Sequence, residues 1–172
     1  ALYVSFDITG YMNANKNVFG IMLGNGFYYI PNVENRWKPL ANAFGYPCVK
    51  AKIIITYTDG SNEEVVTDPT WKVTEGPVSF TSIFVGEDYD ATRELPGWQK
   101  TGYDDSQWKN SLVVDGPTQL VSQQSNYLTI NKIFEVTHIS EPKPGAWVYD
   151  FGQNASAIPA IKVSGKKGDL IK

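Results

Sequence analysis

The sequence contains few of the side chains that build most catalytic and metal sites. Its 172 residues include one cysteine, Cys48, and one histidine, His138. A single cysteine excludes an intrachain disulfide and a cysteine-rich zinc site. A single histidine leaves little for a Ser-His-Asp triad or a multi-histidine metal centre. The sequence therefore predicts neither a metal site nor a bound cofactor.

The chain also lacks an excess of positive charge and a long apolar run. Fifteen Lys and Arg residues against eighteen Asp and Glu residues give a net charge of −3. A chain with this charge balance lacks the excess of positive charge that is typical of a nucleic-acid-binding protein. No apolar run approaches the ~20 residues of a membrane-spanning helix. We expect neither a nucleic acid nor a membrane as a partner.

The residues that are plentiful favour β-structure. The sequence has 15 Val, 13 Ile and 12 Thr but only 10 Ala and 8 Leu, and 13% of its residues are aromatic. β-branched and aromatic side chains suit a pleated, half-buried surface. The 15 Gly and 10 Pro residues are spread along the chain, as frequent turns require. This composition predicts an all-β fold, with a sandwich favoured over a barrel.

Alternation and turn residues predict individual strands. The clearest hairpin joins Ala51–Tyr57 to Glu63–Thr67 through the Asp59-Gly60 turn. Val18–Leu23 is nearly all apolar and predicts a buried strand. Further strands are expected at Leu2–Ile8, Phe27–Ile30, Trp71–Thr74, Val78–Val85, Leu128–Thr137, Trp147–Phe151, Ile158–Ser164 and Leu170–Lys172.

A proline-rich stretch suggests a domain boundary. Glu141–Gly145 contains two prolines and a glycine, which predicts a linker that stops strand pairing. We expect one domain over residues 1–138, and over residues 139–172 a linker with the opening strands of a next β domain. Because the chain ends within the expected strand Leu170–Lys172, we expect it to be part of a longer protein.

Few polar residues stand out as candidates for a site. Asp90 and other acidic residues cluster near Arg93, which predicts either a buried Asp–Arg pair or a site. Cys48 follows a proline and is expected to be a small buried hydrophobe. His138 is expected to be an ordinary exposed or half-buried histidine.

Aromatic residues are the stronger candidates for a binding surface. Sugar-binding proteins stack pyranose faces on Trp and Tyr rings and hold hydroxyl groups with polar side chains. Alternatively, such rings anchor loops onto a sandwich. The candidate sugar contacts lie in a loop over residues 31–47, in the residues just before it, and in an irregular stretch over residues 87–109. They are Tyr28, Tyr29, Trp37, Trp98, Asp90 and Arg93.

Several strings of residues resemble a known family. The most specific are Leu23-Gly24-Asn25-Gly26-Phe27-Tyr28, Gly86-Glu87-Asp88-Tyr89-Asp90-Ala91 and Asp150-Phe151-Gly152-Gln153-Asn154. A fourth, Asp104-Asp105-Ser106-Gln107-Trp108, is shared with other jelly-roll sugar-binding domains. In this order they resemble the N-terminal region of bacterial α-L-rhamnosidases, glycoside hydrolase family 78.

The resemblance implies a fold and a role. The fold would be a jelly-roll (galactose-binding-like) antiparallel β-sandwich, followed by the start of a second β domain. In the family, catalysis is inverting and uses carboxylates of a later (α/α)6 barrel, so no catalytic residue is expected here. The chain would then be a non-catalytic accessory domain that scaffolds its parent enzyme and takes part in substrate recognition. The alternative is a free-standing carbohydrate-binding sandwich.

Partners and compartment follow from the same resemblance. An L-rhamnose-containing carbohydrate and the catalytic barrel and other domains of the parent enzyme are the expected partners. The family's first strands have no counterpart before Ala1, so unpaired strand edges predict dimerisation by edge pairing. For a parent enzyme that acts on polysaccharides, a periplasmic or extracellular location is favoured over the cytoplasm.

Overall fold

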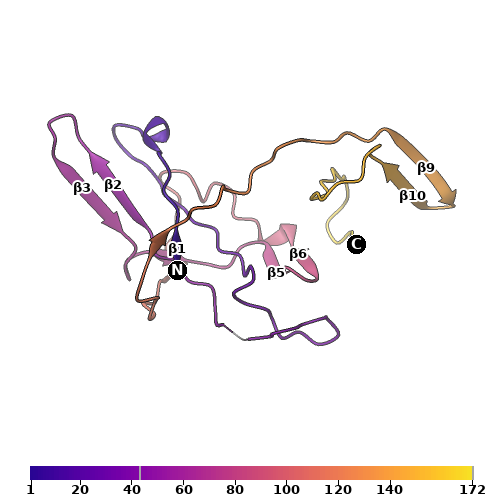
Figure 1. Cartoon of the computed structure of the whole chain (residues 1–172), viewed down its shortest axis with the longest axis horizontal. Coiled ribbons are helices and arrows are strands. Elements are labelled where there is room, and N and C mark those ends of the chain that lie inside the picture. Colours follow the sequence, from indigo (N-terminus) through magenta and orange to yellow (C-terminus); the bar gives the residue numbers. More distant parts are fainter. Residues whose placement is uncertain (43, 172) are drawn as a thin grey trace. The chain divides into compact units, whose positions relative to one another are not determined.

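The computed structural model describes residues 1–42 and 44–171 (Figure 1). The chain divides into two compact units, Ala1–Gln123 and Gln124–Lys172, and each is described by itself. The domain boundary expected at residue 138 stays a prediction.

Unit 1 is built from short strands with two single-turn 3-10 helices, η1 (Thr9–Tyr11) and η2 (Ala91–Arg93). Within residues 1–42 and 44–123, the strands pair into four two-stranded ladders, of which one is parallel and three are antiparallel. The parallel ladder joins β1 (Leu2–Tyr3) to β8 (Val121–Ser122), and the antiparallel ones are β2 (Lys52–Thr56) with β3 (Asn62–Val66), β4 (Lys72–Val73) with β7 (Lys109–Asn110), and β5 (Val78–Ser82) with β6 (Gly86–Tyr89).

The β2–β3 hairpin confirms the clearest prediction from sequence. Ile53 and Ile55 are half-buried while the side chain of Ile54 between them is exposed, so the expected alternation holds. The turn closes through the N–H of Tyr57, which donates to the carbonyl of Ser61 at 2.9 Å. Gly60 has φ = 86°, a conformation that glycine adopts without steric cost.

The expected buried strand at Val18–Leu23 is wrong. These residues form no ladder, and only Ile21 among them is even half-buried. All of these residues except Met22 instead line an open apolar cavity beside β2 and β4. The apolar run therefore lines a cavity without being buried or paired as a strand.

Other expected strands are shorter or missing. Leu2–Ile8 is reduced to β1, and Phe27–Ile30 forms no strand. Residues 128–137 and 158–164 form no strand, and neither do residues 170 and 171, while Lys172 lies outside the described residues. Among the described residues only Ile30, at 1% exposure, is a fully buried apolar side chain.

The described part of unit 2, residues 124–171, contains one antiparallel hairpin, β9 (His138–Lys143) with β10 (Ala146–Asp150). β9 runs through Pro142, so residues 141–143 belong to a strand, but pairing is interrupted at Pro142 as expected, because neither Glu141 nor Pro142 has a register partner. The register shifts between Ala146 and Val148, which leaves Glu141 and Pro142 opposite Trp147. Such a bulge accommodates a residue that has no N–H to donate. β10 confirms the strand predicted at Trp147–Phe151.

A repeated Asp-x-Ser/Thr turn stabilises the loops of unit 1. In each copy the aspartate carboxylate accepts a hydrogen bond from the backbone N–H two residues later, at 2.7–3.0 Å. These bonds lower the pKa of each carboxyl below its ordinary 3.8, with the Ser or Thr side chain contributing most except at Asp104, where the backbone N–H of Ser106 contributes most. The aspartates are Asp7, Asp59, Asp68, Asp90 and Asp104.

Acidification is expected to destabilise unit 1 through these turns. Because the folded pKa values lie below the unfolded value of 3.8, the stabilisation is fully present above that pH. It is lost as the pH falls through the lower folded pKa values. Urea midpoints measured from neutral pH down to about pH 2 should therefore drop below about pH 4, and Asp59→Asn should lessen the drop. A midpoint that does not change across that range would contradict the assignment.

Candidate functional site

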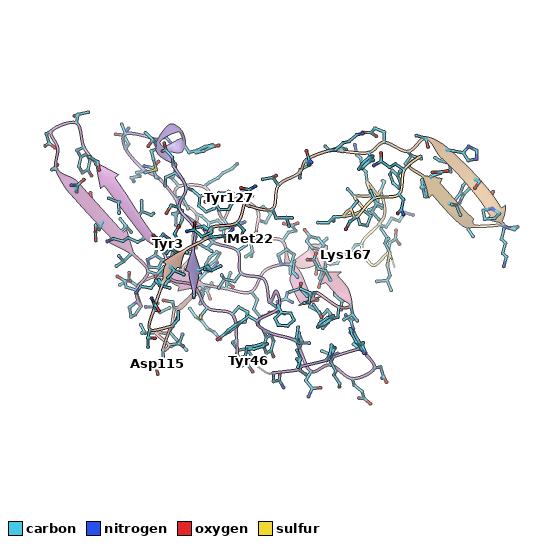
Figure 2. All side chains as sticks on the ribbon, in the orientation of Figure 1. Tyr3, Met22, Tyr46, Asp115, Tyr127 and Lys167 are labelled. Carbon is cyan, nitrogen blue, oxygen red and sulfur yellow. The ribbon has the colours of Figure 1, made fainter. Side chains whose placement is uncertain are left out.

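An exposed aromatic cluster lies in the loop between Asn25 and Ala51. The rings of Tyr28 and Phe44 stack with centroids 6.1 Å apart, and Phe27 lies 5.7 Å from Phe44. The ring centroids of Tyr29 and Tyr46 are 4.9 Å apart. Tyr46, which is labelled in Figure 2, is 77% exposed. Partial burial, and then the neighbouring Tyr46 hydroxyl, raise the pKa of Tyr29. The cluster offers flat apolar rings with polar edges to solvent.

The backbone of this loop is unusual. Asn35, Leu40 and Asn42 all have φ values near +60°, a region that side-chain-bearing residues seldom adopt. For Leu40 the conformation has a steric cost, which is typical of functional loops. The N–H of Asn42 donates to the carbonyl of the buried Ile30 at 3.2 Å and holds the loop in this form.

Trp37 lies apart from the exposed aromatic cluster, against the β5–β6 hairpin. Its ring meets Phe84 edge-on at 4.9 Å. Next to it, the Arg36 guanidinium lies 4.1 Å from the Phe80 ring centroid and forms a 2.7 Å ion pair with Asp88. A cation–π contact and an ion pair on one side chain fix the loop to the hairpin. The Trp37 ring touches the hairpin through Phe84 and is otherwise 65% exposed.

Trp98 lies in a second aromatic cluster, next to an apolar cavity of about 630 Å³. Its ring lies 6.5 Å from Trp108, which meets Tyr103 edge-on at 5.8 Å. The six-membered ring of Trp98 also lies directly against the backbone of Gly20. Trp98 is thus packed between two segments that are far apart in the sequence.

Asp90 and Arg93 lie together at the two ends of η2. The N–H of Arg93 donates to the Asp90 carbonyl at 3.0 Å, and the Asp90 carboxylate accepts from Thr92. The Arg93 side chain pairs with Glu75 at 2.6 Å. The expected buried Asp–Arg pair is therefore wrong: the partner is a glutamate 18 residues earlier, and its carboxylate is 89% exposed.

A polar hollow of about 660 Å³ opens beside this ion pair. The sequence pointed to Arg93, but it did not point to Glu75 and Lys109, the other charged residues that line the hollow. No local spacing links Glu75 to Arg93, and a β7 lysine such as Lys109 looks like any exposed strand residue. The hollow is lined by Val73, Thr74, Glu75, Arg93, Gln107 and Lys109.

The six candidate sugar contacts therefore fall into four places. Tyr28 and Tyr29 belong to the exposed aromatic cluster, and Trp37 packs against the β5–β6 hairpin. Trp98 borders the apolar cavity, and Asp90 and Arg93 lie at η2. Their role in sugar binding stays a prediction.

The remaining polar candidates have no chemical partner that marks a site. Cys48 is exposed, so its expected burial is wrong. His138 is exposed at the start of β9, as expected. Among residues 1–42 and 44–171, no three metal-ligating side chains gather.

Helices in the described part of the chain are too short to cross a bilayer.

These ladders and loops define an all-β domain, and comparison with known proteins identifies its family. A family model of the alpha-L-rhamnosidase N-terminal domain matches residues 1–132. An alpha-L-rhamnosidase of Formosa agariphila is 37% identical over 100% of this chain and 18% of its own length. One from Streptomyces avermitilis is 31% identical over 99% of this chain and 16% of its own length.

Two solved structures agree with the sequence matches. The alpha-L-rhamnosidase from Dictyoglumus thermophilum has a TM-score of 0.60 at 36% identity, over 64% of this chain and 13% of that one. The Streptomyces avermitilis enzyme complexed with L-rhamnose has a TM-score of 0.57 at 36% identity, over 61% and 10%. The predicted all-β sandwich class is confirmed.

The chain belongs to the alpha-L-rhamnosidase N-terminal domain family. It spans less than a fifth of the length of the curated relatives named above.

Proposed function

We propose that this chain is a non-catalytic accessory domain of an α-L-rhamnosidase, an enzyme that hydrolyses terminal α-L-rhamnose from glycosides or polysaccharides. The family match over residues 1–132 carries the proposal. The much greater length of the relatives supports it, since it leaves room for separate catalytic domains. By resemblance to glycoside hydrolase family 78, catalysis is inverting and belongs to a later (α/α)6 barrel.

The arrangement of the carboxylates supports a non-catalytic role. A glycosidase needs two carboxyl groups facing each other across roughly 5–10 Å. Here Asp59, Asp68 and Asp90 accept hydrogen bonds within their own turns, and Glu64 pairs with Lys52 at 2.6 Å on the surface of the β2–β3 hairpin. These carboxylates serve turns and strand pairs.

The domain's contribution is chiefly structural, as a jelly-roll sandwich that docks against other domains of the parent enzyme. Trp37 and Trp98 support this role because both rings pack against other parts of unit 1. Two-stranded ladders such as β9–β10 leave outer edges open to pairing, which supports edge-strand dimerisation of the isolated chain.

A carbohydrate-binding role is the second candidate, and the Tyr28–Phe44 stack favours it. These rings are exposed, and aromatic faces of this kind suit the apolar face of a sugar. In this alternative the chain is a carbohydrate-binding sandwich, with Tyr28 and Tyr29 as the contacting residues.

Titration with L-rhamnose and methyl α-L-rhamnoside separates the two candidates. The scaffold proposal predicts no saturable change in tryptophan fluorescence or in the chemical shifts of Trp37 and Trp98. It also predicts no hydrolysis of p-nitrophenyl α-L-rhamnoside by the chain alone. Saturable shifts at Tyr28 and Tyr29 would support the binding alternative, and turnover would contradict the accessory role. Size-exclusion chromatography of the same sample tests the dimer, which a clean monomer at high concentration would rule out.

A further inference from the structure

The polar hollow beside η2 differs from the aromatic surfaces in its chemistry. It lies at the β4–β7 ladder, where Val73 and Lys109 are register partners, and extends to Arg93 at the end of η2. Its volume of about 660 Å³ falls within the range of ligand sites, about 300–1,000 Å³. No aromatic side chain is part of the lining, so a ligand here would be held by charge and hydrogen bonds.

The charges of the hollow favour an anion. Arg93 and Lys109 carry positive charge and Glu75 carries negative charge, which leaves one net positive charge in a chain of net charge −3. The ion pairs of the described residues are Arg36–Asp88, Lys52–Glu64 and Arg93–Glu75, so the Lys109 ammonium group is in none of them. That ammonium group is the natural counter-ion for a carboxylate ligand.

The Glu75–Arg93 pair positions the guanidinium group. The pair is formed through Nη2, and a guanidinium group carries five N–H donors in a fixed planar geometry. The Arg93 side chain is 34% exposed, so it is reachable from solvent. Gln107 adds an amide donor and acceptor, and Thr74 adds a hydroxyl group, both of which suit the hydroxyl groups of a sugar.

We propose that this hollow binds a sugar unit that bears a carboxylate. This unit would be a uronic acid residue in the saccharide on which the parent enzyme acts. Lys109 pairs with the carboxylate, while Arg93, Gln107 and Thr74 hold the carboxylate or the ring hydroxyl groups. The assignment of a saccharide rests on the proposed function, whereas the preference for an anion rests on the charges of the hollow. This site would recognise the sugar unit next to the terminal rhamnose that a rhamnosidase cleaves.

The test is a titration of the full chain with D-glucuronic acid, D-glucose and acetate, followed by amide chemical shifts. We expect saturable shifts around Lys109 and Arg93 with glucuronic acid and no saturation with glucose. Acetate should bind much more weakly, because it lacks the hydroxyl groups. Equal binding of glucose would overturn the role of the carboxylate, and equal binding of acetate would overturn the saccharide assignment.

Variants of two neighbouring lysines complete the test. Lys109→Gln should weaken glucuronic acid binding about tenfold, as expected for loss of a charge-assisted hydrogen bond, and Lys109→Arg should largely retain it. Lys72→Gln is the matched control, because Lys72 lies on the same ladder but its Nζ donates to Asn110 at 2.9 Å. Unchanged binding in Lys109→Gln, or an equal loss in Lys72→Gln, would contradict the proposal.

The result is separable from the proposed function. A chain that hydrolyses a rhamnoside would contradict the accessory role whatever glucuronic acid does. An inactive chain that shows no saturation with glucuronic acid would overturn the site and leave the accessory role intact.

Discussion

Replacing Gly20 with alanine is expected to destabilise unit 1 by about 1–3 kcal/mol, the usual cost of overpacking. A Cβ atom on residue 20 would lie 2.8 Å from Cη2 of Trp98 and closer still to Cζ3. The indole ring cannot move freely, because it is also packed against Trp108. Urea unfolding followed by tryptophan fluorescence measures the change.

Two controls separate this clash from a general effect of alanine. Gly24 lies at the end of the same segment and has no atom within 4 Å of an added Cβ, so Gly24→Ala should change stability by no more than about 0.5 kcal/mol. Trp98→Phe removes the part of the indole that clashes, so Gly20→Ala should cost less in that background. Additive costs in the double variant would contradict the contact.

Local chain signals were enough to predict one hairpin of this fold, β2–β3. Asp59-Gly60 lies between two alternating runs and specifies the β2–β3 turn by itself, because Gly60 can take a positive φ value. The strand predicted at Trp147–Phe151 corresponds to β10, but its partner β9 was not predicted, because its prolines suggested a linker. Val18–Leu23 was assigned wrongly because a short apolar run does not distinguish a paired strand from an extended segment that lines a cavity.

Contacts between distant residues were beyond the reach of sequence reasoning. Arg36 and Asp88 are 52 positions apart, and Glu75 and Arg93 are 18 apart, with nothing in the local pattern to pair them. The polar hollow exists only because the chain brings η2 next to the β4–β7 ladder. The candidate aromatic residues were visible in the sequence, but their division into separate clusters was not.

Trp71 gives the second large expected effect. Its indole N–H donates to the carbonyl of Val66 at 3.0 Å, and its ring meets Phe19 edge-on at 6.1 Å. It therefore joins the end of β3 to the unpaired segment around Phe19. Trp71→Ala should destabilise unit 1 by about 2 kcal/mol, less than the roughly 3–5 kcal/mol of a fully buried tryptophan, because this side chain is half-buried.

The matched variant Trp71→Phe divides this loss between the hydrogen bond and the ring. Phenylalanine keeps an aromatic edge for Phe19 but has no N–H for the Val66 carbonyl, so its cost should be about 1 kcal/mol. Urea unfolding followed by far-UV circular dichroism measures both variants without relying on the fluorescence of the tryptophan that is removed. Equal losses in the two variants would assign the whole effect to the hydrogen bond. A negligible loss in Trp71→Ala would show that the segment around Phe19 is held to unit 1 by other contacts, chiefly the packing of Trp98 on Gly20.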